Sequence, residues 1–514
     1  GRNRACMPSD TGDGVDIVEA TVAEVHAAFE AGALTAAALV DRYLDRIEAY
    51  DDELNAILTL NDTARSRAER LDEQFAADGL VGPLHGVPVI IKDNADTHDM
   101  PTTAGSTALA ESVPEEDAFV VDRLRAAGGV ILAKANLQEF AFGVDTISSL
   151  GGATRNAYDL GRRPAGSSGG TAAAIAANLG AVGTGSDTCS SVRSPAAFNN
   201  SVGLRPTRGL ISRSGIVPLC STQDTVGPIT RTVADTARML DVLAGYDPAD
   251  PATATGADRI PAGGYTTHLD PDGLDGARIG VVREFFGRSS SESASAAAAE
   301  RVTAVVEGAL EAMAAAGATI VDPVEVVDAD VLAAARVLEY EFARDFDAYL
   351  AGLDGDVPYD SLAGIVESGA VAPAVAERIR ESDILEGDSD RLAENVGYLR
   401  SLDRRRRCRE RTVARLVESD LDALAYPPSV VPPVEIPTHQ PFAELRCELA
   451  AHTGLPAITV PAGFTDDGLP VGVELLGRSF AEPRLIELAY AFERASDHRR
   501  PPERFGPLES ATNQ

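Results

Sequence analysis

The sequence predicts an α/β protein in which helices pack against a central β-sheet. Residues 87–91 are apolar and, apart from Pro88, β-branched, which is typical of a strand buried on both faces. A helical segment at 117–127 ends near two glycines, and a second apolar run follows at 130–132. Because strand, helix and strand follow one another in this order, we expect the two strands to pair in parallel.

The elements that precede these strands follow from capping signals. Thr21 and Glu24 have the spacing of a capping box, and apolar residues recur at helical intervals until Gly32. Thr35 is placed to cap a second helix, whose apolar residues form one stripe. Residues 1–15 are polar and rich in glycine and aspartate, so we expect a flexible tail there.

The rest of the chain shows neither an internal repeat nor a long linker, and we expect a single domain over residues 16–506. The spacing of apolar residues, together with glycines that end or interrupt the segments, predicts four helical regions. They lie at about 171–178, after Ser191, at 290–318 and between 371 and 402 with a break at Gly387. Short apolar runs predict two further strands, at 421–425 and 458–460.

The negative net charge argues against two classes of binding partner. Of the 514 residues, 79 are acidic and 45 are basic, which gives a net charge of −34. Such a surface repels nucleic acids and anionic lipids, so we expect neither a nucleic-acid partner nor a membrane partner. Only Lys92 and Lys134 are lysines, and an acidic excess with so little lysine is typical of a halophilic protein. GC-rich codon usage is an alternative reason for the arginine bias, but it does not by itself account for the net charge.

Cysteine usage predicts a reducing, cytoplasmic environment. The number of cysteines is odd and none forms a CxxC pair, so we expect neither a disulfide framework nor a zinc site; they are Cys6, Cys189, Cys220, Cys408 and Cys447. No apolar run approaches the 18 residues of a membrane-spanning helix, and the first residues contain no apolar stretch of the signal-peptide type.

Several common catalytic motifs are missing. The seven histidines form no HExxH pattern, and no GxxxxGK[ST] segment is present. Residues 166–170 match GxSxG, but Arg162-Arg163-Pro164 precedes them instead of the strand that a nucleophile elbow requires. We therefore expect no metal, no cofactor and no serine–histidine–aspartate triad.

Lys92 is the first candidate for catalysis. It follows the apolar residues 89–91 directly, in a chain that otherwise uses arginine. Burial lowers the pKa of a lysine and can leave it neutral, whereas an arginine stays protonated. The position therefore predicts a proton acceptor. The alternative is a charge at the end of a strand, paired with an acidic neighbour such as Asp93.

Two segments rich in glycine and serine are the next candidates. Residues 165–171 combine glycines with Ser167 and Ser168 and lead into a predicted helix, which suits a nucleophile or an anion. In residues 184–193, backbone amides can converge on an oxyanion. Each segment alone is more often a flexible turn.

Together with Lys92, these segments resemble the amidase signature family. The resemblance covers nearly all of residues 18–500 and rests on seven segments: GVPVIIKDN at 86–94, AGSSGGTAAA at 165–174, GSDTCSSVRSPA at 185–196, VGLRPTRGLISRSGIVPL at 202–219, DTVGPITRTVADTARMLD at 224–241, GLPAITVPAGF at 454–464 and GLPVGVELLGR at 468–478. It implies the amidase-signature fold, a central mixed β-sheet flanked by α-helices on both faces.

The resemblance also implies how the domain is divided. The catalytic core would comprise about residues 80–245 and 420–500. A more variable helical region, about 288–420, would lie on the substrate side. The implied substrate is a small-molecule amide, and a homodimer is left open as an assembly.

The resemblance implies a role for each site residue. Ser191 would be the nucleophile, Ser167 the serine held by a cis peptide bond, and Lys92 the base. Ser191 would attack the amide carbonyl and pass its proton through Ser167 to neutral Lys92, and water would then hydrolyse the acyl-enzyme. Ser168 would support this relay.

The oxyanion hole implied by the family lies in the turn before the nucleophile. It would be made by the backbone amides of Thr188, Cys189, Ser190 and Ser191. Many members have two glycines where this chain has Cys189-Ser190. The side chains at both positions restrict the turn, and Cys189 is a second, much weaker candidate for the nucleophile. The family's register favours Ser191.

Three functions remain to be compared. The first is a free-standing amidase. The second is the glutaminase subunit of the Asp/Glu-tRNA amidotransferase, which belongs to the same family. Residues 427–454 are short for that subunit, which favours the free-standing amidase. The third is an inactive binding or scaffold protein, and the intact Lys92, Ser167 and Ser191 argue against it.

Overall fold

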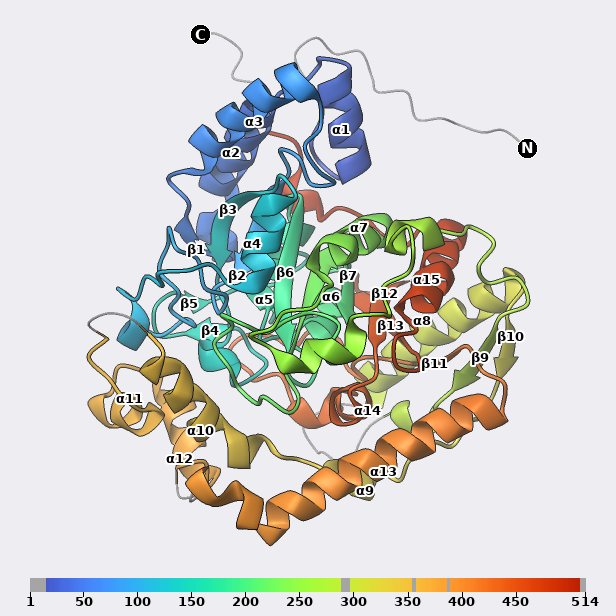
Figure 1. Cartoon of the computed structure of the whole chain (residues 1–514). Helices are drawn as coiled ribbons and strands as arrows, with labels where there is room; N and C mark the ends of the chain where they lie inside the picture. The colour runs from blue at the N-terminus through green and yellow to red at the C-terminus, as the bar shows by residue number, and fades with distance from the viewer. Residues whose placement is uncertain (1–14, 288–295, 354–356, 386–388, 509–514) are drawn as a thin grey trace.

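The structure is a computed structural model that describes residues 15–287, 296–353, 357–385 and 389–508. A mixed sheet runs through the molecule (Figure 1), and its strands lie in the order β1-β3-β2-β6-β8-β7-β12-β13-β11-β9-β10. These strands are β1 (Ile57–Leu60), β2 (Pro88–Lys92), β3 (Val130–Ala135), β6 (Val182–Asp187), β7 (Val202–Arg205), β8 (Thr225–Thr230), β9 (Arg278–Val281), β10 (Thr319–Val321), β11 (Ala423–Tyr426), β12 (Ala457–Phe464) and β13 (Pro470–Leu476).

Helices cover both faces of this sheet (Figure 1), as the family resemblance implied. They are α1 (Val22–Glu30), α2 (Ala36–Leu54), α3 (Ala64–Asp78), α4 (Phe119–Ala126), α5 (Gly169–Ala176), α6 (Arg193–Phe198), α7 (Val233–Leu243), α8 (Ala296–Ala315), α9 (Ala329–Ala333), α10 (Leu338–Ala351), α11 (Leu362–Ser368), α12 (Pro373–Glu381), α13 (Val396–Glu418), α14 (Glu448–Thr453) and α15 (Glu482–Ser496). A separate pair of short strands, β4 (Ile147–Ser148) and β5 (Gly152–Ala153), forms a second small sheet.

The arrangement of β2, β3 and β6 positions the candidate site. β2 pairs in parallel with both β3 and β6, which confirms the pairing that was predicted for the first two. The carboxyl ends of parallel neighbours meet at one edge of a sheet. Lys92, the last residue of β2, and Asp187, the last residue of β6, therefore lie at the same edge.

Local capping explains where the first helices begin. The side chain of Thr21 accepts a hydrogen bond from the backbone N–H of Glu24, and the Glu24 carboxylate accepts one from the N–H of Thr21, so both halves of the predicted capping box are present. Thr35 caps α2 through the N–H of Ala38, at 3.1 Å. α4 begins two residues later than predicted. Its expected first residue, Asp117, instead accepts from the N–H of His98 and pairs with Arg125.

Most of the remaining predicted elements are present with shifted ends. The helix predicted at 290–318 is α8, and the segment between 371 and 402 contains α12 and the start of α13. The break predicted at Gly387 and nearly all of the predicted tail lie outside the described residues. Within the described residues, no helix is both long enough and apolar enough to cross a membrane.

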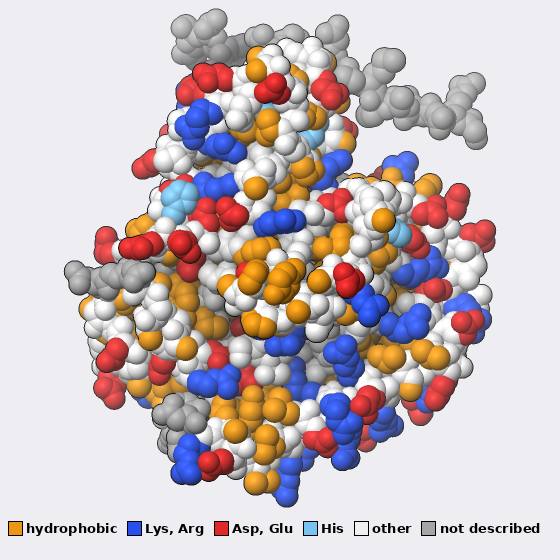
Figure 2. Space-filling view, in the orientation of Figure 1, with side chains coloured by type: hydrophobic (Ala, Val, Ile, Leu, Met, Phe, Trp, Pro, Cys, Tyr) orange, Lys and Arg blue, Asp and Glu red, His pale blue; other side chains and the backbone are white. Residues whose placement is uncertain are grey.

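The surface in Figure 2 mixes acidic and basic side chains. Both lysines of the chain are missing from the surface, because Lys92 and Lys134 are buried. The Lys134 ammonium lies 2.9 Å from the carboxylate of Asp93 and also donates to the carbonyl of Pro101. The second lysine is therefore a paired buried cation, which secures the chain just after β2.

Candidate active site

Lys92 lies in a buried cluster of hydroxyl groups. Its Nζ donates to Ser167 Oγ at 2.7 Å and to Ser186 Oγ at 2.8 Å, and the side chain is 1% exposed. Burial lowers the pKa of Lys92 from 10.5 to about 7, although the nearby carboxylates of Asp187 and Asp224 act in the opposite direction. Near neutral pH the amine can therefore lose its proton and act as a base.

Ser186 and Asn94 belong to this cluster, although sequence reasoning did not single them out. Asn94 Nδ2 donates to Ser186 Oγ at 2.9 Å, so Ser186 connects Lys92 to Asn94. The signal that would have found Ser186 is the parallel register of β2 and β6, in which Ile91 lies opposite Thr184. That pairing joins segments about ninety residues apart, and the local pattern does not contain it.

Ser167 and Ser168 lie where the segment at 165–171 enters α5. The peptide bond between Gly166 and Ser167 is cis, as the resemblance led us to expect. Ser168 Oγ donates to the carbonyl oxygen of Ser186 at 3.2 Å. Gly185 allows this contact, because a Cβ there would lie 2.7 Å from Ser168 Oγ. Ser168 thus binds the strand that carries Ser186.

Ser191 lies in the turn between β6 and α6. The carbonyl oxygen of Ser191 accepts from the N–H of Ser168 at 3.2 Å, which joins the two serine segments. The turn borders a cavity of about 280 Å³, whose lining includes Thr188, Cys189, Ser190 and Ser191. In the described part of the chain, none of the backbone N–H groups of these four residues has a hydrogen-bond acceptor. Free amides beside a cavity can bind an oxyanion.

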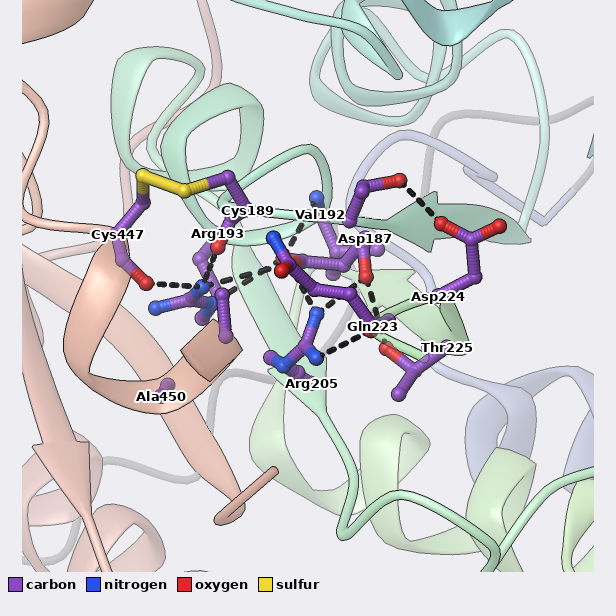
Figure 3. A network of polar contacts seen from close by, with 12 residues as sticks. Asp187, Cys189, Val192, Arg193, Arg205, Gln223, Asp224, Thr225, Cys447 and Ala450 are labelled. Carbon is purple, nitrogen blue, oxygen red and sulfur yellow. Dashed lines mark hydrogen bonds and ion pairs between the residues drawn. A yellow bond between two sulfur atoms is a disulfide. The ribbon is translucent and has the colours of Figure 1, made fainter. Parts of the chain in front are cut away.

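A buried ionic network fixes the residues on both sides of this turn (Figure 3). The Asp187 carboxylate pairs with Arg193 at 3.1 Å and with Arg205 at 2.8 Å, and it also accepts from the N–H of Val192 at 3.1 Å. Burial by itself would raise the pKa of Asp187, but the two guanidinium groups outweigh it and hold this pKa at about 2. The carboxylate is therefore charged, and it fixes the start of α6 relative to β6.

A second carboxylate holds the other side of the turn. Asp224 accepts from Thr188 Oγ1 at 2.6 Å and from the N–H groups of Leu219 and Cys220, each at 2.9 Å. Leu219 and Thr188 both line the cavity. Asp224 therefore connects the turn to a second segment of the cavity lining.

The expectation that the chain has no disulfide is wrong. Cys189 and Cys447 form one, over a sequence separation of 258 residues. Cysteine count and spacing could not find this pair, because its proximity depends on how α14 packs against the turn. Cys220 and Cys408 are free and buried, and Cys6 lies outside the described residues. In a disulfide Cys189 has no thiolate, so this structure also removes it as the alternative nucleophile.

The helical region at 288–420 supplies part of the cavity wall, including the apolar residues Val337 and Leu338. Phe442, from the segment before α14, also lines the cavity. Charged groups also line the cavity, and several already have partners: Arg336 pairs with Glu339 at 2.6 Å. His452, on α14, donates from Nδ1 to the carbonyl of Leu332 at 2.9 Å. Burial lowers the pKa of His452 to about 3, so its ring is neutral.

One group of side chains in the described residues is close enough to hold a metal ion: His98, Asp99 and Asp117. Arg125 already pairs with both carboxylates, at 2.7 Å from Asp99 and 2.8 Å from Asp117. Because a guanidinium balances this negative charge, the group is better described as an ion-pair cluster than as a metal site.

Comparisons with known proteins agree with the geometry. A family model described as Amidase matches residues 38–486. The chain is 35% identical to a probable amidase of Arabidopsis thaliana over 505 residues, which is 95% of this chain and 92% of the relative. It is 39% identical to a subunit of the glutamyl-tRNA(Gln) amidotransferase of Moorella thermoacetica over 472 residues, which is 90% of this chain and 93% of the relative.

A solved structure is similar over almost the same length. The native peptide amidase from Stenotrophomonas maltophilia superposes with a TM-score of 0.85 at 38% identity, covering 94% of this chain and 98% of that one. The family model, the full-length relatives and the shared architecture lead to one conclusion: the chain belongs to the amidase signature family of hydrolases that act on carbon–nitrogen bonds.

Proposed function

We propose that this chain is an amidase that hydrolyses a linear amide bond to a carboxylate and ammonia or an amine, through Ser191, Ser167 and Lys92. The observation that carries the proposal is the environment of Lys92. A buried amine with a pKa of about 7 is hydrogen bonded to Ser167, and the same edge of the sheet carries a serine turn with free amides. A base, a relay and an oxyanion site are the parts that acyl transfer needs.

The steps follow from these positions. Ser191 Oγ attacks the amide carbonyl carbon, and its proton passes to Ser167 while Ser167 gives its own proton to Lys92. The amides of residues 188–191 hold the negative oxygen. Lys92 then returns the proton through Ser167 to the leaving nitrogen, the carbon–nitrogen bond breaks, and water releases the acid from Ser191 by the same route.

One contact in this relay must tighten when substrate binds. Among the described residues, no hydrogen bond joins the hydroxyls of Ser191 and Ser167. Catalytic hydrogen bonds are often long without substrate and shorten in the reacting complex. Ser168 already holds the two segments together through its bond to the Ser191 carbonyl.

The similarity to a peptide amidase and the partly apolar cavity support a peptide amide or another amide with an apolar acyl group as substrate. The test is a hydrolysis screen with the purified chain in high salt, in which ammonia release is measured from aliphatic, aromatic and peptide amides. Turnover by the chain alone is expected. Turnover of no amide would contradict the proposal and favour a scaffold protein.

A second candidate, the glutaminase subunit of a tRNA-dependent amidotransferase, is supported by the 39% identity to such a subunit. The same screen separates it from the first. A glutaminase subunit would act on glutamine, and its activity would depend on partner chains. A free-standing amidase hydrolyses simple amides without them. Sedimentation of the purified chain would also test the homodimer, which stays a prediction.

The cytoplasmic location expected from cysteine usage also stays a prediction. The disulfide between Cys189 and Cys447 argues against it, because disulfides persist mainly in oxidising compartments. Peptide mapping of protein purified under a thiol-blocking reagent tests whether Cys189 and Cys447 are linked. A linked pair would contradict a reducing location, and two blocked thiols would support it.

A further inference from the structure

We propose that the Cys189–Cys447 disulfide is a positioning element that holds α14, one wall of the substrate cavity, against the turn at residues 188–191, which we call the oxyanion turn. By fixing this distance it sets the preference for large acyl groups. The inference rests on the proposed amidase function. It goes beyond that function because it assigns a role in specificity to a bond outside the triad.

The disulfide connects two parts of the cavity lining. Cys189 lies two residues before Ser191, within the turn whose amides are free. Cys447 directly precedes α14, whose Glu448 and His452 line the same cavity. Figure 3 shows the bond spanning from the turn to the start of α14. A change in the distance between these two elements would alter the width of the cavity beside the nucleophile.

Arg193 joins the same two elements by a weaker, non-covalent contact. Its guanidinium contacts the carbonyl oxygen of Cys189 and lies 3.4 Å from the carbonyl oxygen of Cys447. Arg193 is itself held by Asp187 and Glu474. The turn is therefore fixed to the sheet whether or not the disulfide is present, so the loss of the disulfide should leave the oxyanion turn in place.

α14 packs both on the sheet, where Leu449 shares an apolar cluster with Tyr426 and Leu476, and on helices of the region at 288–420. The carbonyl of Ala451 accepts from Arg405, on α13, at 2.9 Å. His452 Nδ1 donates to the carbonyl of Leu332, on α9, at 2.9 Å. The disulfide is thus a covalent cross-link between the start of α14, which also packs with α9 and α13, and the turn before α6. Without it, the start of α14 can shift relative to the turn.

These contacts predict that loss of the disulfide affects the hydrolysis of large amides more than that of small ones. A small acyl group, such as that of acetamide, needs the triad and the oxyanion turn. A bulky acyl group, such as that of an N-acylated aromatic amino-acid amide, also contacts the walls of the cavity. Displacement of a positioning group by about 1 Å can cost on the order of a hundredfold in rate. Loss of the disulfide should therefore reduce hydrolysis of the bulky amide much more than hydrolysis of acetamide.

The experiment compares kcat and KM for these two amides in the wild-type chain and in Cys447→Ala. The variant is expected to lower kcat/KM for the bulky amide on the order of tenfold or more, and for acetamide by less than about twofold. Cys447→Ser should show the same change in selectivity, because it removes the same bond. Cys408→Ala, which removes a buried free thiol, is the matched control and should keep the wild-type selectivity.

Chemical reduction supplies a second arm. A water-soluble phosphine and one water molecule convert the disulfide into two thiols, and the phosphine is oxidised to its oxide. Reduction should give wild-type protein the selectivity of Cys447→Ala and should leave that variant unchanged. Equal losses for both amides, or unchanged selectivity in all the cysteine variants, would overturn the proposal, as would peptide mapping that finds no linked pair.

A readout that needs no turnover separates this inference from the proposed function. Hydrogen exchange of the α14 amides, followed by mass spectrometry, should speed up in Cys447→Ala, while exchange in β2 and β6 should not change. Unchanged exchange in α14 would overturn the positioning role even if amides are hydrolysed. Faster exchange in α14 together with no amide turnover by wild type would instead contradict the proposed function.

Discussion

The pKa of Lys92 is the residue-scale property on which the proposed chemistry depends. Removal from water disfavours the ammonium, while Asp187 and Asp224 favour it, and burial is the larger effect. Both carboxylates are occupied by other partners, namely Arg193 and Arg205 for Asp187 and a set of hydrogen-bond donors for Asp224. Neither carboxylate makes an ion pair with Lys92, and the amine can therefore become neutral at a pH near 7.

We expect kcat/KM to rise with pH through about 7 and then to level off. The sign follows because the deprotonated amine is the active form, so activity falls as acid protonates it. Lys92→Arg should lower kcat/KM on the order of 10²–10⁴-fold at every pH, because arginine keeps its proton. A pH–rate profile of both proteins provides the measurement. An active arginine variant with a flat profile would contradict the base assignment.

Ser191→Ala should lower kcat on the order of 10⁴-fold or more, since the variant lacks the attacking hydroxyl. The fold should be unchanged, because Ser191 Oγ makes no hydrogen bond within the described residues. Steady-state hydrolysis and thermal unfolding of the variant are the two measurements. Near-wild-type turnover would show that another group is the nucleophile.

At the scale of elements, the parallel pairing of β2 with β6 and the entry into α5 determine the site. The pairing of β2 with β6 brings Lys92 beside Ser186, and the turn after β6 carries Ser191. α5 enters from the same edge and supplies Ser167 at its N-terminal side. Lys92, Ser167 and Ser191 thus each lie at or beside the end of an element, and these ends meet at one edge of the sheet.

Capping provides a prediction at this scale. Thr35→Ala should reduce the free energy of unfolding by about 1 kcal/mol, because the N–H of Ala38 loses its acceptor. Thr35→Ser is the matched control, since serine keeps a side-chain oxygen that can accept from the N–H of Ala38. Urea unfolding of both variants tests this. A larger loss in the control would contradict the capping account.

The charge of the whole molecule is unusual, and it leads to a prediction about salt. The net charge of −34 produces self-repulsion in the folded state. Molar salt shortens the Debye length to about 3 Å and screens this repulsion. Because the two lysines are buried, the exposed basic side chains other than histidine in the described residues are all arginines.

We therefore expect the midpoint of thermal unfolding to rise from low to multi-molar KCl, and to rise more than for a near-neutral family member measured in parallel. Amide hydrolysis should follow stability without a separate optimum, because a neutral substrate needs no electrostatic steering. An unchanged midpoint would contradict the halophilic interpretation and leave codon usage as the reason for the arginine bias.

The sequence by itself determined the features that depend on a few neighbouring residues. The capping signals at Thr21 and Thr35 placed α1 and α2, and the apolar run before Lys92 placed β2. A helix cap involves about three consecutive residues and a strand pattern about five or six, so both can be recognised in the sequence without knowledge of tertiary contacts. The order of strand, helix and strand was also enough to predict the parallel pairing of β2 with β3.

Only the tertiary structure decided which distant segments meet. The disulfide joins cysteines 258 residues apart, and the partners of Lys92 come from β6 and from the entry to α5. The cavity likewise combines the turn after β6 with α14 and residues 336–339, at the start of α10. Such contacts depend on how complete elements pack around a common core, and neither spacing nor composition specifies that packing.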